Sequence, residues 1–432
     1  MNFFSTNHKA AIVDFKLATI KGQAPDKGLY FPQKIPILSE TFIKNIEDYS
    51  NEAIAYEVIK PYVGSCIHVT KLKQIVEETI NFSIPLVPVN ENIFSLELFH
   101  GPTLAFKDVG ARFMSRCLGF FVKNEPKKVT VLVATSGDTG GAVANGFYNV
   151  PNVDVIILYP SGKVSAVQEK QMTTLGKNIT VLEVKGSFDD CQKMVKDIFA
   201  TARNFKNLFL TSANSINVAR WLPQQFYYFL AYKQWADKDN PPVIAVPSGN
   251  FGNVCAGILA QASGLPVKHF IAACNANDVV PQFFETGLYE PKKAVATISN
   301  AMDVGNPSNF VRILQLYKQQ MDDVKKIVSA TSVSDDDTKA TLKKVYEQFN
   351  YLLDPHGAVG YHSLEKYLQQ QPAQKGIVIE TAHPVKFFDV VEPIINTAVP
   401  VPSVIEDQLK LPKNSMLMEN NTEALRDYLL KL

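Results

Sequence analysis

One lysine of this sequence, Lys107, has neighbours suited to nucleophilic chemistry. Leu104, Ala105 and Phe106 precede it, and the segment is mostly apolar. An ammonium group that loses its hydration in apolar surroundings has a lowered pKa, and the neutral amine can attack a carbonyl carbon to form a Schiff base. A lysine at a helix start is more commonly exposed, but a cation there opposes the helix dipole. We therefore take Lys107 as the candidate catalytic residue.

A glycine-rich loop is suited to binding an anion through backbone amides. It reads Ser-Gly-Asn-Phe-Gly-Asn over residues 248–253, and a helix is expected over 254–262. Glycine lets backbone N–H groups turn towards an anion, and a helix start adds partial positive charge. The loop contains no lysine or arginine, so it would hold a phosphate mainly by backbone donors. An ordinary strand-to-helix turn is the alternative, since neither a P-loop nor a G-x-G-x-x-G motif occurs.

Two further loops carry polar groups of other kinds. The run Thr-Ser-Gly-Asp-Thr-Gly-Gly (135–141) suits a carboxylate or a second phosphate, although an aspartate or threonine N-cap is equally compatible. Thr381 closes an apolar run, where its hydroxyl can bond a heteroatom at the floor of a pocket or cap the next helix. An imine-forming lysine, a phosphate loop, a carboxylate-sized loop and a lone hydroxyl together describe a pyridoxal phosphate site.

These groups need strands and helices that bring them together. Short apolar runs alternate with helical stretches from residue 91 onwards, which is typical of parallel β-α-β units with both sheet faces covered. The sequence predicts strands at 93–98, 129–134, 153–159, 179–184, 208–211, 242–246, 269–273 and 376–380. Four runs each follow one of these strands: 99–108 with Lys107, 135–141, 248–253, and 380–384 with Thr381. Ligands of open α/β sheets bind outside the carboxyl ends of the strands. We expect the loops to converge on one site, or at most two.

The chain is long enough for more than one hydrophobic core. Its 432 residues suggest two or three domains at about 150 residues each. Residues 1–90 lack this alternation of strands and helices. They contain a turn-like stretch at 21–34 and amphipathic helices expected around 40–62 and 71–82. The expected units are an N-terminal cap (1–90), a large cofactor-binding lobe (91–126 and 213–400), a small α/β lobe (127–212) and a C-terminal extension (401–432) with a helix at 422–430. The cofactor would lie between the lobes.

Composition narrows the class of protein. Lysine plus arginine count 43 and aspartate plus glutamate 42, and this formal charge of +1 argues against a general binder of nucleic acid or acidic membranes. The five cysteines are scattered without a C-x-x-C pair, no apolar run approaches the roughly 18 residues of a membrane span, and the first residues do not resemble a secretory signal. His356 and His383 stand isolated, so no metal site is predicted. These features indicate a reduced, cytoplasmic enzyme or binding protein.

Several runs resemble the sequence blocks of the threonine synthase family. In the order of that family, they are KGLYFP (27–32), LFHGPTLAFKD (98–108), ATSGDTG (134–140), SANSIN (212–217), PSGNFGN (247–253), NAMDVGNPSNF (300–310) and TAHPVKF (381–387). The resemblance covers nearly the whole chain, and the lysine run looks like the family's cofactor attachment motif. It implies a fold-type-II pyridoxal phosphate enzyme with two parallel-sheet lobes, related to the β subunit of tryptophan synthase.

The resemblance also implies an activity and assigns site residues. The substrate would be O-phospho-L-homoserine, converted with water to L-threonine and phosphate, and Lys107 would carry the cofactor as a Schiff base. The cofactor phosphate would be held by Gly249, Asn250, Phe251, Gly252 and Asn253, and the pyridine nitrogen would be bonded by Thr381. The substrate carboxylate would be received by Ser136, Gly137, Asp138 and Thr139. The chain lacks the long N-terminal extension of plant relatives, so we expect no activation by S-adenosylmethionine and favour a monomer over a dimer.

The substrate phosphate needs donors of its own. Lys163 and Ser165 follow a predicted strand at the carboxyl edge, and further candidates are Asn214, Asn217 and Arg220. Each could instead be a solvent-facing charge or a helix cap.

Two other functions remain open at this point. A phospho-lyase of the same fold would share the first half-reaction but yield 2-oxobutanoate and phosphate, so the lysine motif does not separate the two. A non-catalytic sensor of pyridoxal phosphate or of an amino acid is disfavoured by the intact lysine, phosphate loop and carboxylate loop.

Overall fold

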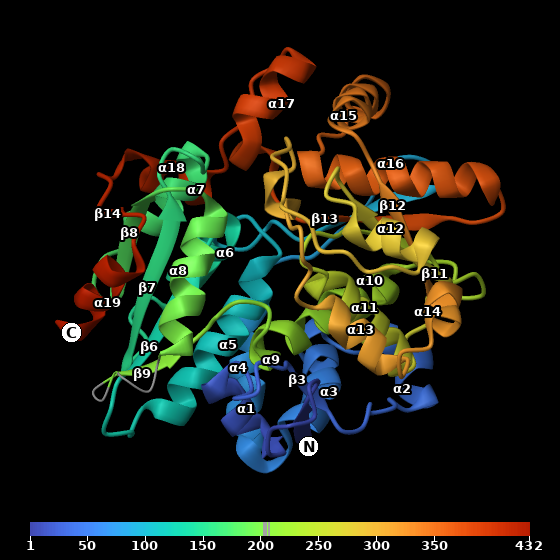
Figure 1. Cartoon of the computed structure of the whole chain (residues 1–432). Coiled ribbons are helices and arrows are strands. Elements are labelled where there is room, and N and C mark those ends of the chain that lie inside the picture. Colours follow the sequence, from blue (N-terminus) through green and yellow to red (C-terminus); the bar gives the residue numbers. More distant parts are fainter. Residues whose placement is uncertain (202–204, 206–207) are drawn as a thin grey trace.

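The computed structural model describes residues 1–201, 205 and 208–432. Two β-sheets, each with its own packed helices, lie next to each other, and the N-terminal segment lies across one end of both (Figure 1). Within the described ranges, no helix is both long and apolar enough to cross a membrane. All five cysteines are unpaired.

The N-terminal segment combines a small antiparallel sheet with four helices. The strands, in the order β2-β1-β3, are β1 (Asn2–Ser5), β2 (Val13–Asp14) and β3 (Tyr30–Pro32). The helices are α1 (Phe15–Lys21), α2 (Glu40–Lys44), α3 (Asn51–Val63) and α4 (Val69–Thr79). The two predicted helical regions are confirmed, but the first is broken because Ser50 caps a new helix. The sheet was not predicted, since its strands are too short to show alternation.

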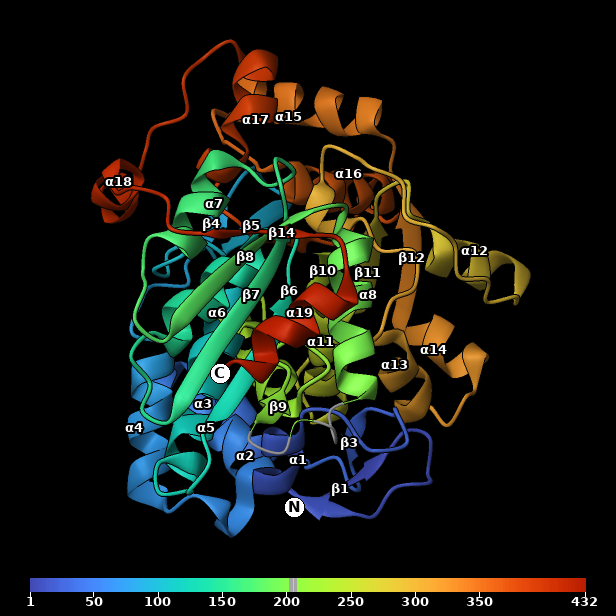
Figure 2. The ribbon, with the colours of Figure 1, turned by 60° about the vertical axis from the view of Figure 1, so that its left-hand side comes forward.

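The smaller sheet is parallel throughout and has the order β14-β8-β7-β6-β9. Its strands are β6 (Val129–Ala134), β7 (Val153–Pro160), β8 (Ile179–Lys185), β9 (Phe209–Thr211) and β14 (Met416–Glu419). Its helices are α6 (Asp138–Phe147), α7 (Ala166–Thr173), α8 (Phe188–Ala200), α18 (Ser403–Lys410) and α19 (Thr422–Leu430). The first four strands confirm the prediction. Figure 2 shows the unpredicted strand β14 beside β8, with α19 against α8.

The larger sheet has the order β12-β11-β10-β13-β5-β4 and is parallel except for β4. Its strands are β4 (Leu86–Pro88), β5 (Ile93–Glu97), β10 (Val243–Pro247), β11 (His269–Cys274), β12 (Val328–Ser332) and β13 (Gly376–Glu380). Every residue of β10 and β13 is buried, which explains why these strands read as continuous apolar runs. The predicted parallel arrangement is confirmed, and the two edge strands β4 and β12 were missed.

Helices cover both faces of the larger sheet and fill the space towards the smaller one. They are α5 (Lys107–Val122), α9 (Val218–Trp221), α10 (Gln225–Gln234), α11 (Gly252–Ala262), α12 (Val279–Thr286), α13 (Phe310–Leu316), α14 (Met321–Ile327), α15 (Asp335–Phe349), α16 (Pro355–Gln370) and α17 (Phe388–Ile395). The two sheets separate the strands of 129–211 from those of 86–97 and 243–380. The division into a cap, two lobes and an extension stays a prediction.

Candidate active site

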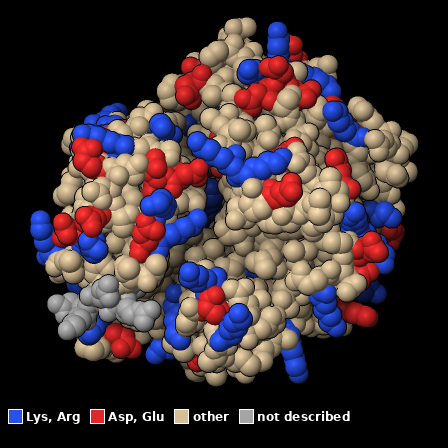
Figure 3. Space-filling model, in the orientation of Figure 1, with Lys and Arg blue, Asp and Glu red and all other residues tan. Residues whose placement is uncertain are grey.

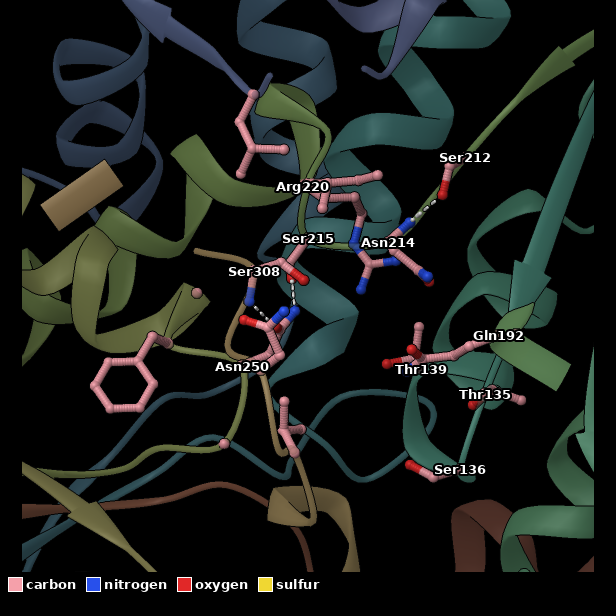
Figure 4. A pocket seen from close by; sticks show the side chains of 18 of the residues that line it. Thr135, Ser136, Thr139, Gln192, Ser212, Asn214, Ser215, Arg220, Asn250 and Ser308 are labelled. Atoms are coloured by element: carbon pink, nitrogen blue, oxygen red, sulfur yellow. Dashed lines mark hydrogen bonds between the residues drawn. The ribbon is translucent and has the colours of Figure 1, made fainter. Parts of the chain in front are cut away.

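The four runs that carry the candidate site residues line one cavity of about 1090 Å³. Its wall includes Lys107, Thr381, residues 135, 136, 138 and 139, and residues 249–253. In Figure 4, Ser136 and Thr139 lie on one side of this space and Asn250 on the other. The space-filling view in Figure 3 shows a hollow in the surface with lysine and arginine side chains around it. The structure thus brings together residues from four separate strand ends, as the expected convergence requires.

The backbone around Lys107 is held against the loop that contains Thr381. Phe106 N donates to Thr381 O at 2.9 Å, and His383 N donates to Leu104 O at 3.0 Å. Leu104 has a φ of +55°, a conformation that non-glycine residues keep only when the surrounding structure imposes it. These contacts fix the first residue of α5, Lys107, relative to the end of β13.

The Lys107 amine has the environment of a nucleophile. The side chain is half-buried and faces the cavity, with Nζ 5.2 Å from the centroid of the Phe106 ring. Burial lowers the pKa of Lys107, Asp138 opposes this shift, and Lys386 and Arg220 add to it. Two positive charges near a buried amine favour its neutral form. The structure therefore supports the lowered pKa expected from the apolar sequence neighbours.

The loop 135–139 is shaped by Thr135, which sequence reasoning left without a role. Its Oγ1 accepts hydrogen bonds from Gly137 N at 3.0 Å and from Gly140 N at 2.8 Å. Gly137 has a φ of +136°, a value suited to glycine. Asp138 and Thr139 do not cap α6, because Gly137 occupies the N-cap position, and the threonine that bonds the first turn is Thr135, through Gly140 N. The amides of Asp138 and Thr139 keep their donor capacity.

Asp138 instead belongs to a buried ion pair. Its Oδ1 lies 2.7 Å from Lys386 Nζ, and Gln168 Nε2 donates to the same oxygen at 2.9 Å. Burial alone would raise the pKa of Asp138, but Lys386 and Lys107 outweigh it and hold that pKa well below its usual range. Lys386 Nζ also donates to Thr103 O at 2.8 Å. Sequence reasoning missed Lys386, although it lies within the run 381–387 that carried the family resemblance.

The loop 248–253 offers backbone groups because its asparagine side chains are occupied. Asn253 bonds Pro247 O and Val254 N, while Asn250 bonds Ser215 Oγ and Ser308 N. A Cβ on Gly249 would lie 2.6 Å from Met302 Cα, so only glycine fits there. The N-cap of α11 makes no side-chain hydrogen bond, and since Val254 N is taken by Asn253 Oδ1, the amides of Gly252 and Asn253 are the ones left for an anion.

A buried pair of carboxyl groups, Glu380 and Asp354, lies directly behind Thr381. Asp354 N donates to Glu380 Oε1 at 2.6 Å, and Asp354 Oδ1 lies 2.5 Å from His356 Nδ1. Ala301 N donates to His356 Nε2, so the ring carries its proton on Nδ1. Burial and the neighbouring Asp354 raise the pKa of Glu380 well above its usual value. We infer that burial beside Asp354 favours the neutral form of Glu380 in the folded chain.

Replacing Glu380 by glutamine is expected to remove one component of the pH dependence of stability. The folded chain keeps a proton on Glu380 where the unfolded chain has lost it, so this contribution is complete below about pH 4.5 and declines as the pH rises towards the raised pKa. Glutamine does not titrate, so E380Q lacks this decline. As the pH rises, the free energy of unfolding of E380Q minus that of the wild type should increase by up to about 1.4 kcal/mol per pH unit. Urea unfolding from pH 5 to 8 measures this. The exposed E423Q is the control, and parallel pH profiles for E380Q and wild type would contradict the inference.

Of the residues predicted for the substrate phosphate, the structure places two at the cavity. Arg220 and Asn214 line it (Figure 4), and each has a buried polar atom without a protein partner, Nε and Oδ1. Asn217 is buried, bonds Thr19 O and caps α9. The remaining two candidates do not line the cavity: Ser165 caps α7, and Lys163 is exposed.

Further lysines line the mouth of the cavity without any signal in the sequence. They are Lys21, Lys27, Lys196, Lys292 and Lys293. These residues come from distant segments and are exposed, so nothing in their local sequence distinguishes them from other surface lysines. They place several positive charges around a cavity whose proposed ligands are anionic.

The comparisons with known proteins agree with this geometry. Residues 83–381 match the family described as "Pyridoxal-phosphate dependent enzyme", residues 2–80 match "Threonine synthase N terminus" and residues 357–429 match "Threonine synthase, C-terminal". Threonine synthase from Haemophilus influenzae is 42% identical, with 100% of both chains covered, and that from Escherichia coli K12 is 41% identical, with 97% of this chain and 96% of the relative covered.

Solved structures of similar proteins give the same result. The crystal structure of threonine synthase from Escherichia coli superimposes with a TM-score of 0.93 at 40% identity and covers 100% of both chains. The structure of PLP-bound threonine synthase from Brucella melitensis has a TM-score of 0.92 at 33% identity, with 100% of this chain and 99% of that chain covered. The expected fold class, a fold-type-II pyridoxal phosphate fold, is confirmed. The chain belongs to the threonine synthase family of pyridoxal-phosphate dependent enzymes.

Proposed function

We propose that the chain converts O-phospho-L-homoserine and water to L-threonine and phosphate with pyridoxal 5'-phosphate as cofactor. One observation carries the proposal: in a member of this family, Lys107, the 135–139 loop, the 248–253 loop and Thr381 line a single cavity. The chain length and all three family regions match those of the relatives.

The residues present fit this cofactor. The uncapped start of α11 and the glycine at position 249 suit its phosphate, Lys107 suits its aldehyde, and the Thr381 hydroxyl suits its ring nitrogen. When bound, pyridoxal phosphate supplies an electron sink conjugated to the substrate amine. A hydroxyl at the ring nitrogen does not force its protonation, unlike a carboxylate, so Thr381 would tune this sink to moderate strength.

Lys107 Nζ is the proposed proton carrier. Its lowered pKa lets it take the proton from the α-carbon and pass it on within the site, so that the amine is neutral again when it takes a second proton from the β-carbon. Phosphate would leave the γ-carbon with the electrons of its C–O bond, and Lys107 would return the β-proton to the γ-carbon. Water would then add its hydroxyl at the β-carbon and give its proton to the released phosphate, and the first proton would be returned to the α-carbon. The free amides at the start of α6, with Ser136 and Thr139, would hold the substrate carboxylate, and Asp138 would keep Lys386 in place rather than touch the substrate.

Arg220 and Asn214 are the proposed ligands of the substrate phosphate. Both line the cavity and carry buried polar atoms without protein partners. Burial lowers the pKa of Arg220 to about 10, which leaves it charged at neutral pH. Lys163, Ser165 and Asn217 are not proposed as phosphate ligands, because they lie outside the cavity, and Ser165 and Asn217 cap helices.

Incubation with O-phospho-L-homoserine, with threonine and phosphate measured together, tests the proposal. Equal amounts of threonine and phosphate are expected, with 2-oxobutanoate as a trace at most. A dominant keto acid would instead identify a phospho-lyase, and absence of both products would refute the assigned substrate.

We further propose that the chain acts as a monomer in the cytoplasm, without a nucleic-acid or membrane partner. Five unpaired cysteines, four of them buried, support a reducing compartment. The near-zero formal charge supports the absence of a polyanionic partner. Light scattering of the purified protein measures the oligomeric state, and a dimer mass would correct it.

A further inference from the structure

Ser215 lies at the cavity wall between two asparagines whose amide orientations are fixed. Its Oγ accepts a hydrogen bond from Asn250 Nδ2 at 3.0 Å and from Asn309 Nδ2 at 2.9 Å. The oxygen of the Asn250 amide accepts from Ser308 N at 2.6 Å, and that of Asn309 accepts from Arg312 Nη1 at 2.6 Å. A backbone N–H and a guanidinium can only donate, so neither amide can be turned round. Both NH₂ groups therefore point at Ser215.

This arrangement decides what the Ser215 hydroxyl can do. A hydroxyl has two acceptor lone pairs and one proton. The two asparagines use both lone pairs, so the proton remains for donation to a third group. The side chain is half-buried and lines the cavity beside Asn250 (Figure 4). Ser215 thus presents a donor, and not an acceptor, next to the 248–253 loop.

Arg312 is a buried cation that anchors the same network. It is fully buried, donates to Ser215 O and Ile216 O, reaches Tyr30 O at 3.1 Å, and lies 4.3 Å from the Trp221 ring. Among the described residues, no carboxylate forms an ion pair with it or shifts its pKa. Burial lowers the pKa of Arg312 to about 9, as expected for a guanidinium without a counter-charge. A buried charge of this kind is stabilised when an anion binds nearby.

We propose that Ser215 donates its hydroxyl proton to the cofactor phosphate held by the 248–253 loop, and that Arg312 is the positioning residue that fixes this donor and offsets the negative charge. The inference rests on the proposed function and deepens it. The phosphate loop itself contains no cation. The positive charge is that of Arg312, which bonds Asn309, and Asn309 in turn bonds Ser215. Ser215 lies in the run SANSIN, where sequence reasoning singled out only the two asparagines.

Binding of two phosphate probes to the full-length protein tests this inference. Cofactor-free wild type, S215A and R312K are titrated with pyridoxal phosphate by absorbance, and with inorganic phosphate by thermal shift. Loss of one hydrogen bond to a charged group predicts roughly tenfold weaker binding of both probes by S215A. S403A is the matched control, because it removes an exposed serine hydroxyl that does not line the cavity. It should bind both probes as the wild type does.

The outcomes separate the inference from the proposed function. Wild-type binding by S215A would overturn the role of Ser215. Unchanged cofactor affinity with a raised KM for O-phospho-L-homoserine would assign Ser215 to the substrate phosphate and equally overturn it. R312K should keep most of the rise in Tm that inorganic phosphate causes, and R312M should lose it. If R312M has a lower Tm than the wild type but the same rise with phosphate, Arg312 has only a structural role. If R312M does not fold, S215A and R312K decide. A wild type that binds neither probe would refute the proposed function itself.

Discussion

K107A is expected to lose at least about a thousandfold in kcat with O-phospho-L-homoserine. Lys107 Nζ carries the protons of the α-, β- and γ-carbons in the proposed sequence, and a positioned acid–base group contributes about 10²–10⁴ in rate. The lowered pKa of this amine, caused by burial and by nearby Lys386 and Arg220, cannot be reproduced by bulk water at the same place. Threonine formation under saturating substrate measures the loss.

The protein fold and the phosphate loop should survive this change. K107A should keep the wild-type Tm within a few degrees and still bind inorganic phosphate, since the start of α11 is unaltered. K123A, which removes an exposed lysine just beyond the other end of the same helix, should have wild-type activity. A K107A enzyme with more than a tenth of wild-type kcat would remove Lys107 from the mechanism.

K386M is expected to destabilise the folded chain by about 3–5 kcal/mol, because it leaves a buried carboxylate without its partner. Lys386 is fully buried, and its Nζ pairs with Asp138 Oδ1 at 2.7 Å. Without the ammonium group, Asp138 keeps only Gln168 as a side-chain donor in the described structure. Burial then raises the pKa of Asp138, so the variant should be least stable at neutral and high pH, where the carboxyl must lose its proton.

Urea unfolding at pH 5 and pH 8 measures this effect. K410M removes one half of an exposed pair with Asp407 and should change the free energy of unfolding by less than about 1 kcal/mol. Adding D138N to K386M should recover much of the stability, since it removes the unpaired charge. Equal stability of K386M and K410M would show that the buried pair contributes nothing.

Local sequence was sufficient for the strands that meet the cavity. The runs at 129–134 and 376–380 are buried on both faces and are therefore mostly apolar, with Thr130 and Glu380 as the polar exceptions. Loops after such strands meet at one edge for geometric reasons, so Lys107, Ser136 and Thr381 could be placed together before the structure was known. The glycines also marked the phosphate loop in the sequence. The structure gives a reason for the glycine at position 249, where a Cβ would meet Met302.

Local sequence was insufficient where one residue type has two uses. Serine and asparagine cap helices and also bind phosphate, so Ser165 and Asn217 could not be told from ligands. The pairing of Lys386 with Asp138, and of Glu380 with Asp354, depends on which segments become neighbours in space. The short strands of the N-terminal sheet and β14 are stabilised by distant partners, and their own residues carry too weak a pattern to reveal them.

Strand β14 is synthesised late, although it covers an edge of the smaller sheet. It pairs with β8, and the Lys185–Glu419 contact joins residues 234 positions apart. A ribosome therefore releases β6, β7 and β8 long before the strand that covers the edge of β8. During that interval β8 presents unpaired backbone groups to any neighbouring nascent chain, a known route to aggregation. The yield of folded protein in a cell should accordingly depend on chaperones that protect this edge until translation is complete.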